Sequence, residues 1–316
     1  GYAESDQPRT LGIRRKRGTL NILLIAAVAL VALAVALVCT GLSGEDSSAE
    51  ERYGDFYYEV VNGEVIITDC ARFSDPDIVI PSHIDGRPVT EIGFEAFSGV
   101  FAPVYLKSVT IPDTVEKIGD KAFYHIRTLK TVYMGDNVKV IGDFAFTQCL
   151  ILENVRLSPG LETIGRDAFA ECEMLTKVEI LSATKIMDGA FAETPLQQPL
   201  TLPDGLEYIG DYAFHNCKLE SLWIPDSVTK IGKHAFYGSR TINSLRLPQG
   251  ITELEEGAFS HCGLTSVDIP SSVKYIGKDA FAGNYLTSLV IPEGVETLDK
   301  GAFIANDDLK YVFIPD

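Results

Sequence analysis

Apolar residues recur along most of the chain with a period of 22 or 23 residues. The pair Ala-Phe appears ten times, and after a first interval of 26 residues every later interval is 22 or 23. An Ile or Leu stands five residues before each Phe, and another aliphatic residue, often followed by Pro, stands about twelve before it. The ten phenylalanines are Phe97, Phe123, Phe146, Phe169, Phe191, Phe214, Phe236, Phe259, Phe281 and Phe303. Such self-similarity predicts a solenoid of stacked, repeated units.

Each repeat is close to L-x-S-V-x-I-P-x-x-V-x-x-I-G-x-x-A-F-x-x-C, most clearly from Leu264 to Phe281. The V-x-I segment alternates like a strand with one buried face, and the Pro after it ends the strand because Pro has no N–H for a ladder. The I-G-x-x-A-F segment returns the chain through a turn or a short helix. Parallel strands stacked about 4.8 Å apart would make ten coils roughly 50 Å long.

One glycine occupies the I-G-x-x-A-F segment of every coil, in one of two places. In seven coils it stands four residues before the Phe, and in the other three it stands two before it, at Gly189, Gly257 and Gly301. Met187, Glu255 and Asp299 take the first place in those three coils. We interpret the pattern as two versions of the turn, each with one position that needs positive φ or a close backbone approach.

The ten copies of this motif resemble the BspA-like leucine-rich repeats of bacterial and some protist surfaces. The resemblance covers residues 56–316 and is specific for the fold. It implies a right-handed solenoid of the leucine-rich-repeat type, one parallel strand and one turn or short helix per coil, and a role in surface adhesion or binding. It implies no shared catalytic residue and no single shared ligand.

The residues before the repeats predict a cap. Phe56 to Val61 and Val65 to Thr68 flank Asn62-Gly63, which favours a hairpin with a type I′ turn. Such a hairpin covers the open end of the first coil, where an uncovered edge strand would promote aggregation. We therefore expect a cap and first strand over residues 53–90, repeats over 91–316, and a polar linker over 43–52.

The segment from residue 20 to residue 42 has the length and polarity of a transmembrane helix. Ile22 to Cys39 contains no charge and no strongly polar group, and 18 to 23 residues span roughly 27–35 Å as a helix. Arg14-Arg15-Lys16-Arg17 lies on one side only. The positive-inside rule then places residues 1–19 in the cytoplasm as a tail and the repeats outside the cell.

Two other fates of this segment stay open. A cleaved signal peptide usually has a shorter apolar region, and a lipoprotein would use Cys39 as the lipidated residue, although Val38 stands where Gly or Ala is expected. The chain begins with Gly1 and ends at Asp316 just after a repeat strand. We expect from these ends a fragment of a longer protein.

The charge of the chain limits its partners. The net charge is −17, which disfavours nucleic acid as a partner.

Four cysteines recur at one position of the repeat. Cys149, Cys172, Cys217 and Cys262 each stand three residues after a repeat Phe, a stacked inward position suited to small side chains. We expect free structural thiols, with a Cys149–Cys172 disulfide as the alternative, and no metal site, because tetrahedral zinc needs four converging ligands.

No catalytic motif is present. HExxH, G-x-S-x-G, the P-loop and G-x-G-x-x-G are absent from the sequence, and the five histidines stand at different offsets from the repeat Phe, so they form no single column. We therefore expect no enzyme activity and no cofactor.

Binding is expected on the outward column of the V-x-I strands, whose middle residues point away from the core. The column reads Thr110, Tyr133, Arg156, Glu179, Thr201, Trp223, Arg246, Asp268, Val290 and Phe313. Tyr, Trp and Arg are the residues most enriched at binding hot spots, so Tyr133, Arg156, Trp223 and Arg246 are the candidate ligand contacts. Aromatic residues also favour strands, so the alternative is an ordinary strand surface.

These features predict a membrane-anchored bacterial surface protein that binds an extracellular protein or glycan and mediates adhesion. One alternative is the sensor ectodomain of a transmembrane signalling protein whose cytoplasmic domain precedes Gly1. The other is a spacer that displays a further domain.

Overall fold

The computed structural model describes residues 51–71, 75–99, 105–197 and 199–315. This part of the chain is a β-solenoid of strands and turns, with no helix. The predicted tail and transmembrane segment lie outside the described residues. No helix within the described ranges is long and apolar enough to cross a membrane.

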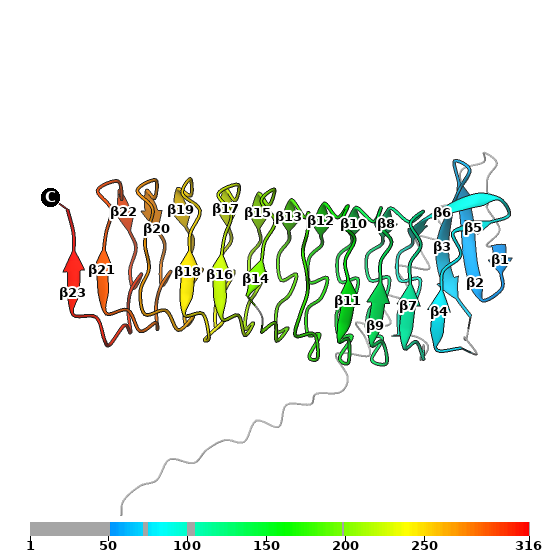
Figure 1. Ribbon diagram of the computed structural model, residues 1–316, viewed down its shortest axis with the longest axis horizontal. Helices are drawn as coiled ribbons and strands as arrows, with labels where there is room; N and C mark the ends of the chain where they lie inside the picture. The colour runs from blue at the N-terminus through cyan, green and yellow to red at the C-terminus, as the bar shows by residue number, and fades with distance from the viewer. Residues whose placement is uncertain (1–50, 72–74, 100–104, 198, 316) are drawn as a thin grey trace, which may run out of the picture. The chain divides into compact units, whose positions relative to one another are not determined.

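Two rows of short parallel strands run along the solenoid (Figure 1). The first row contains the V-x-I strands, with one strand in most coils. Its members are β4 (Asp77–Val79), β7 (Ser108–Thr110), β9 (Thr131–Tyr133), β11 (Asn154–Arg156), β14 (Leu200–Thr201), β16 (Ser221–Trp223), β18 (Ser244–Arg246), β21 (Ser288–Val290) and β23 (Tyr311–Phe313). They pair in the orders β11-β9-β7-β4, β14-β16-β18 and β21-β23.

The second row contains the strands that end on the Ile or Leu five residues before each Phe. Its members are β6 (Arg87–Ile92), β8 (Lys117–Ile118), β10 (Val140–Ile141), β12 (Thr163–Ile164), β13 (Lys185–Ile186), β15 (Tyr208–Ile209), β17 (Lys230–Ile231), β19 (Glu253–Leu254), β20 (Tyr275–Ile276) and β22 (Thr297–Leu298). Most of this row continues the sheet of the amino-terminal cap, and β19-β20-β22 form a separate sheet.

The Ala-Phe turns supply a third line of contacts between coils. In nine successive pairs of coils the N–H of the repeat Phe donates to the carbonyl oxygen of the next coil's Ala, at 2.7–2.9 Å. The ten Phe rings stack in one file, with centroids 4.9–5.5 Å apart and ring planes within 12°. Each coil therefore relies on its neighbours to bury its apolar residues, as a repeat protein requires.

The I-G-x-x-A-F segments form turns, and the short helix offered as an alternative is absent. The residue two before each Phe has φ between 50° and 75° in all ten coils, which breaks a right-handed helix. Of the two alternatives expected for the turn glycines, positive φ is the one found at Gly189, Gly257 and Gly301. The inference of two versions of the turn was wrong. Glu95, Lys121 and five other non-glycine residues take the same positive φ in the other seven coils.

The glycines four residues before the Phe allow close contact between coils. A β-carbon at Gly165 would lie 2.5 Å from the carbonyl carbon of Gly142 in the coil before. The close backbone approach expected for this set is confirmed.

The cap is a three-stranded antiparallel unit. β2 (Phe56–Val61) pairs with β3 (Glu64–Cys70) across Asn62 and Gly63, which have φ of 54° and 84°, as a type I′ turn requires. β3 pairs in parallel with β6 and so covers the first coil. β1 (Glu51–Tyr53) pairs with β2. Residues 51–52, predicted as the end of the linker 43–52, therefore belong to the cap. β5 (His83–Ile84) pairs antiparallel with β6.

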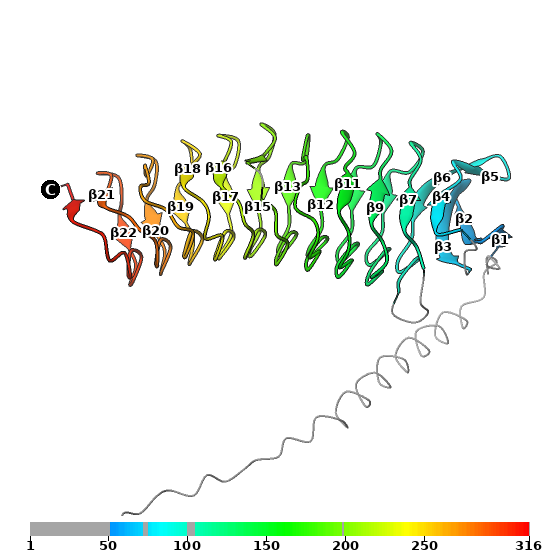
Figure 2. The ribbon, with the colours of Figure 1, turned by 60° about the horizontal axis from the view of Figure 1, so that its bottom comes forward.

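Two V-x-I segments lack strand pairing, although the sequence predicts strands there. These are Val178 to Ile180 and Val267 to Ile269, the second in the repeat closest to the consensus. Val178, Ile180 and Val267 are buried, whereas Glu179 and Asp268 are exposed. Core packing alone maintains this alternation, whereas ladder hydrogen bonds also need two backbones at close distance. Even so, the coils follow one another in a single file (Figure 2).

Candidate functional site

The structure aligns the predicted column across neighbouring strands. Thr110, Tyr133 and Arg156 stand opposite one another in β7, β9 and β11, and Thr201, Trp223 and Arg246 do so in β14, β16 and β18. Val290 and Phe313 pair in β21 and β23. We call this outward-facing column, with Glu179 and Asp268 between its paired members, the strand face.

Val79 extends the strand face by one coil at its amino-terminal end. It stands opposite Thr110 and is 69% exposed. Val79 was not among the column residues predicted from the sequence, although Ile78-Val79-Ile80-Pro81 has the form of the other strands.

The four candidate contacts fall into two pairs of neighbours. Tyr133 stands beside Arg156, and Trp223 stands beside Arg246. Tyr133 and Trp223 are 51% and 66% exposed. The two pairs are separated by the coils of Glu179 and Thr201, so the structure unites the residues within each pair and keeps the pairs apart.

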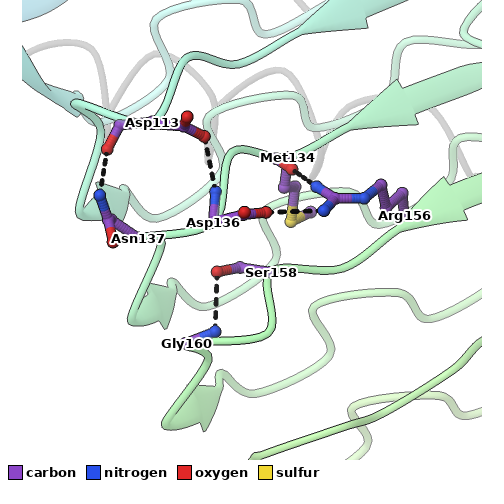
Figure 3. A network of polar contacts seen from close by, with 7 residues as sticks. All are labelled: Asp113, Met134, Asp136, Asn137, Arg156, Ser158 and Gly160. Carbon is purple, nitrogen blue, oxygen red and sulfur yellow. Dashed lines mark hydrogen bonds and ion pairs between the residues drawn. The ribbon is translucent and has the colours of Figure 1, made fainter.

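Each arginine of the strand face is held by the coil before it. Arg246 donates from Nη1 to the carbonyl oxygen of Ile224 at 3.3 Å and from Nη2 to Asp226 at 2.8 Å. Arg156 donates in the same way to the carbonyl oxygen of Met134 and, at 2.6 Å, to Asp136 (Figure 3). Two contacts fix the plane of each guanidinium next to its aromatic neighbour.

Aspartates at this position of the coil also connect the backbones of adjacent coils. Asp226 accepts the N–H of Gln249 at 2.9 Å, and this bond together with Arg246 lowers the pKa of the Asp226 carboxyl. Asp113 likewise accepts the N–H of Asp136 at 2.8 Å (Figure 3). Asp136 and Asp226 were not predicted from the sequence. Their signal is an Asp three residues after an aromatic column residue, combined with an Arg in the same column one coil later.

Shallow hollows adjoin both pairs. One of about 350 Å³ is lined by Thr201, Asp204, Ser221, Trp223 and Arg246, among others. Two more, of about 430 and 490 Å³, both include Tyr133 and Arg156. These volumes fall within the roughly 300–1,000 Å³ of small-ligand sites.

The inward position three residues after the Phe is a hydrogen-bonding site. The side chain there donates to the carbonyl oxygen of the previous coil's repeat Phe in eight coils. The donors are Cys149, Cys172, Thr194, Cys217, Ser239, Cys262 and Asn284, and Asn306 makes the same contact to Phe281. The four repeat cysteines are free and buried. Cys149 and Cys172 therefore form no disulfide with each other. Burial raises the pKa of the Cys149 thiol to about 12.

Three histidines gather with two tyrosines on the outer side of the Ala-Phe turns. Tyr212 stacks on His234 with ring centroids 5.0 Å apart, and His215 stacks on Tyr237 at 5.2 Å. His261 meets the edge of Tyr237 at 5.4 Å. The three histidines stand at different offsets from the Phe and form no single column, as expected. They still lie close together, because residues one or two positions either side of the Phe share the outer surface of the turn.

No three His, Cys, Asp or Glu side chains converge on a metal-sized site within the described ranges.

Comparison with known families settles the class of the repeats. Residues 90–219 and 207–316 match the model of the BspA type leucine rich repeat region, with six copies. The chain belongs to the BspA-type leucine-rich repeat family. No curated protein matches it.

The chain is also similar to solved structures of leucine-rich repeat proteins. The BspA-type chain is similar to the pneumococcal vaccine antigen PcpA, with 22% identity over 85% of this chain and 82% of that chain and a TM-score of 0.56. It is also similar to the leucine rich repeat protein TpLRR of T. pallidum, with 25% identity over 72% and 82% and a TM-score of 0.40. A leucine rich cell surface protein of Faecalibacterium prausnitzii A2-165 matches at 24% identity over 85% and 96%, with a TM-score of 0.40.

Proposed function

We propose that this BspA-type protein is a surface binding module that holds an extracellular protein or glycan on its strand face and mediates adhesion rather than catalysis. The observation that supports this most is Trp223, exposed beside an Arg246 whose guanidinium is fixed by Asp226. An aromatic platform and an oriented cation are present before any ligand arrives, which reduces the entropy lost on binding.

Residues 20–42 are proposed as the anchor, with residues 1–19 in the cytoplasm and the solenoid outside the cell. The unbroken apolar run and the one-sided cluster of Arg and Lys support this orientation. Protease added to intact cells should then remove the solenoid and leave the anchored segment. Protection of the solenoid in intact cells would contradict the orientation.

The binding proposal is tested with the full chain displayed on cells that otherwise do not adhere. Adhesion to surfaces coated with extracellular matrix proteins or glycans is compared between the native chain and the double variant Trp223→Ala, Arg246→Ala. We expect adhesion to fall on the order of tenfold or more, as for loss of a binding hot spot.

A matched control removes the same kinds of side chain elsewhere. Arg240 and Tyr285 line a different hollow, together with His261 and two glycines. The double variant Arg240→Ala, Tyr285→Ala should adhere as the native chain does. Adhesion that survives loss of Trp223 and Arg246, or that needs Arg240 and Tyr285 equally, would contradict the proposal.

A further inference from the structure

The strand face presents the same arrangement twice. Tyr133 corresponds to Trp223 and Arg156 to Arg246, and each arginine bonds to the carbonyl one residue after the aromatic and to the aspartate three residues after it. Each guanidinium is neutralised by its aspartate. The two sets are therefore equivalent subsites, each with one exposed ring and one planar polar pair at its edge.

The surroundings of Trp223 are rich in hydroxyl groups. Ser221 and Thr201 line the same hollow as the ring, and Ser244 stands opposite Ser221 in the adjacent strand. An apolar ring bordered by hydroxyls and a fixed Arg–Asp pair matches a pyranose. The C–H face of a sugar ring packs on an aromatic ring, while its equatorial hydroxyls exchange hydrogen bonds with polar groups at the edge.

Charge argues against an acidic ligand. The chain has a net charge of −17, and both arginines of the strand face are already paired with carboxylates. A polyanion on the strand face would meet long-range repulsion, and the two arginines there are already neutralised by their aspartates. An uncharged ligand meets neither problem.

The spacing between successive coils of the solenoid favours a ligand that is itself a linear chain of repeated units. Phe146 lies in the coil of Tyr133 and Phe236 in the coil of Trp223. Between them, the centroids of successive Phe rings are 5.1–5.4 Å apart. One sugar residue of an extended β-linked glycan is about as long as this rise. A glycan running along the axis therefore stays in register with the coils, and the sugars over Tyr133 and Trp223 are four residues apart.

We propose that the strand face binds a linear, uncharged β-linked polysaccharide along the solenoid axis, with one sugar ring on Tyr133 and another on Trp223. The inference rests on the binding role proposed above and assigns its ligand class. Glu179 and Thr201, between the two subsites, face the intervening sugars and offer them an acceptor and a hydroxyl.

The test uses the full chain in detergent with cellohexaose, N-acetylchitohexaose and the corresponding disaccharides. Trp223 is the only tryptophan of the chain, so its fluorescence reports occupancy of one subsite directly, and calorimetry measures affinity. We expect at least one hexasaccharide to shift the emission and to bind on the order of a hundredfold more tightly than its disaccharide, because it links two subsites.

Variants assign the effect to the two rings. Tyr133→Ala and Trp223→Ala, measured by calorimetry, should each reduce hexasaccharide affinity to about the disaccharide level, whereas Arg240→Ala, Tyr285→Ala should leave it unchanged. Circular dichroism verifies that each variant is folded. Equal affinity for hexasaccharide and disaccharide, or hexasaccharide binding unaffected by loss of either ring, overturns the inference.

The outcome separates this inference from the broader binding role. If neither hexasaccharide binds, yet Trp223→Ala, Arg246→Ala still abolishes adhesion to a coated protein, the strand face is a protein-binding surface. The polysaccharide assignment then fails while the proposed function stands. If the double variant leaves adhesion intact and no hexasaccharide binds, both fail.

Discussion

The hydroxyl of Thr194 donates a hydrogen bond of 2.6 Å to the carbonyl oxygen of Phe169, in the coil before it. Thr194 is completely buried. The bond therefore satisfies a main-chain carbonyl where water is excluded, and equivalent bonds recur along the inward position three residues after the Phe. A buried acceptor that loses its donor costs about 1–3 kcal/mol.

Thr194→Val should accordingly lower the free energy of unfolding by about 1–3 kcal/mol, since valine has nearly the same shape but no donor. Urea denaturation followed by circular dichroism measures the change. Thr194→Ser retains the hydroxyl and should retain more of the stability. If the valine variant were as stable as the native protein, the side chain at this position would act only as a space filler.

The buried thiols should resist reagents in the folded state. Burial raises the pKa of the Cys149 thiol to about 12. The partly buried Cys70 also has its pKa raised to about 12, by burial and by Asp69 and Asp55. The thiolate is the reactive form, so little of it exists at pH 8. In the full chain with Cys39→Ser, an aromatic disulfide reagent should label these thiols slowly before unfolding and rapidly in guanidinium. Fast labelling of several thiols in the folded protein would contradict the assigned burial.

The position of a residue within the repeat could be predicted from the sequence wherever it depends on period alone. The Phe file, the strand column and the inward cysteines follow from spacing, because stacked coils place equal offsets side by side. The Asp226–Arg246 clamp could not be predicted in this way, since it joins different offsets in two coils. The cluster of His215, His234 and His261 was missed for the same reason.

Ladder pairing was also beyond the sequence pattern. Val267 to Ile269 has the alternation of a strand, and its side chains alternate as expected, yet the backbone makes no strand pair. Alternation reports which side chains are buried. Pairing depends on the distance between neighbouring backbones, which the polar and apolar pattern does not encode.

The Phe file predicts unequal costs along the solenoid. Phe191 is fully buried between the rings of Phe169 and Phe214, so Phe191→Ala should cost about 3–5 kcal/mol of unfolding free energy. Phe303 is only partly buried and stacks on Phe281 at the last described coil, so Phe303→Ala should cost less. Urea denaturation of both variants measures the difference, and equal costs would show that ring stacking contributes little.

The Asp226 clamp predicts a dependence of stability on acid pH. Its pKa is lowered by the Gln249 N–H and Arg246, so the folded state favours the carboxylate. The resulting stabilisation is present above the usual aspartate pKa of about 3.9 and is lost as pH falls through the lower folded value. Asp226→Asn should lower the thermal midpoint at pH 7, and the difference from the native protein should shrink between pH 4 and pH 2.

Asp268→Asn, which removes an exposed carboxylate from the strand face, is the control for Asp226→Asn. It should change the midpoint less at pH 7. A difference between native protein and Asp226→Asn that stayed constant down to pH 2 would show that the asparagine acts through something other than charge.

The tyrosine and histidine cluster predicts a second pH dependence, nearer neutrality. Burial lowers the pKa of His234, and nearby His215 lowers it further, against the opposing effect of Glu256. The unfolded chain therefore takes up a proton at His234 before the folded chain does. Stability is fully present above the unfolded pKa of about 6.5 and declines as pH falls from there toward the folded value.

His234→Gln removes this titration, so the drop in thermal midpoint from pH 7.5 to pH 5 should be smaller in the variant than in the native protein. The exposed His83 supplies the matched control, and His83→Gln should leave the native drop unchanged. Because Tyr212 stacks on His234, the variant should also be less stable at pH 7.5, where the imidazole is neutral. An identical pH profile for native protein and His234→Gln would show that protonation at this cluster does not affect the solenoid.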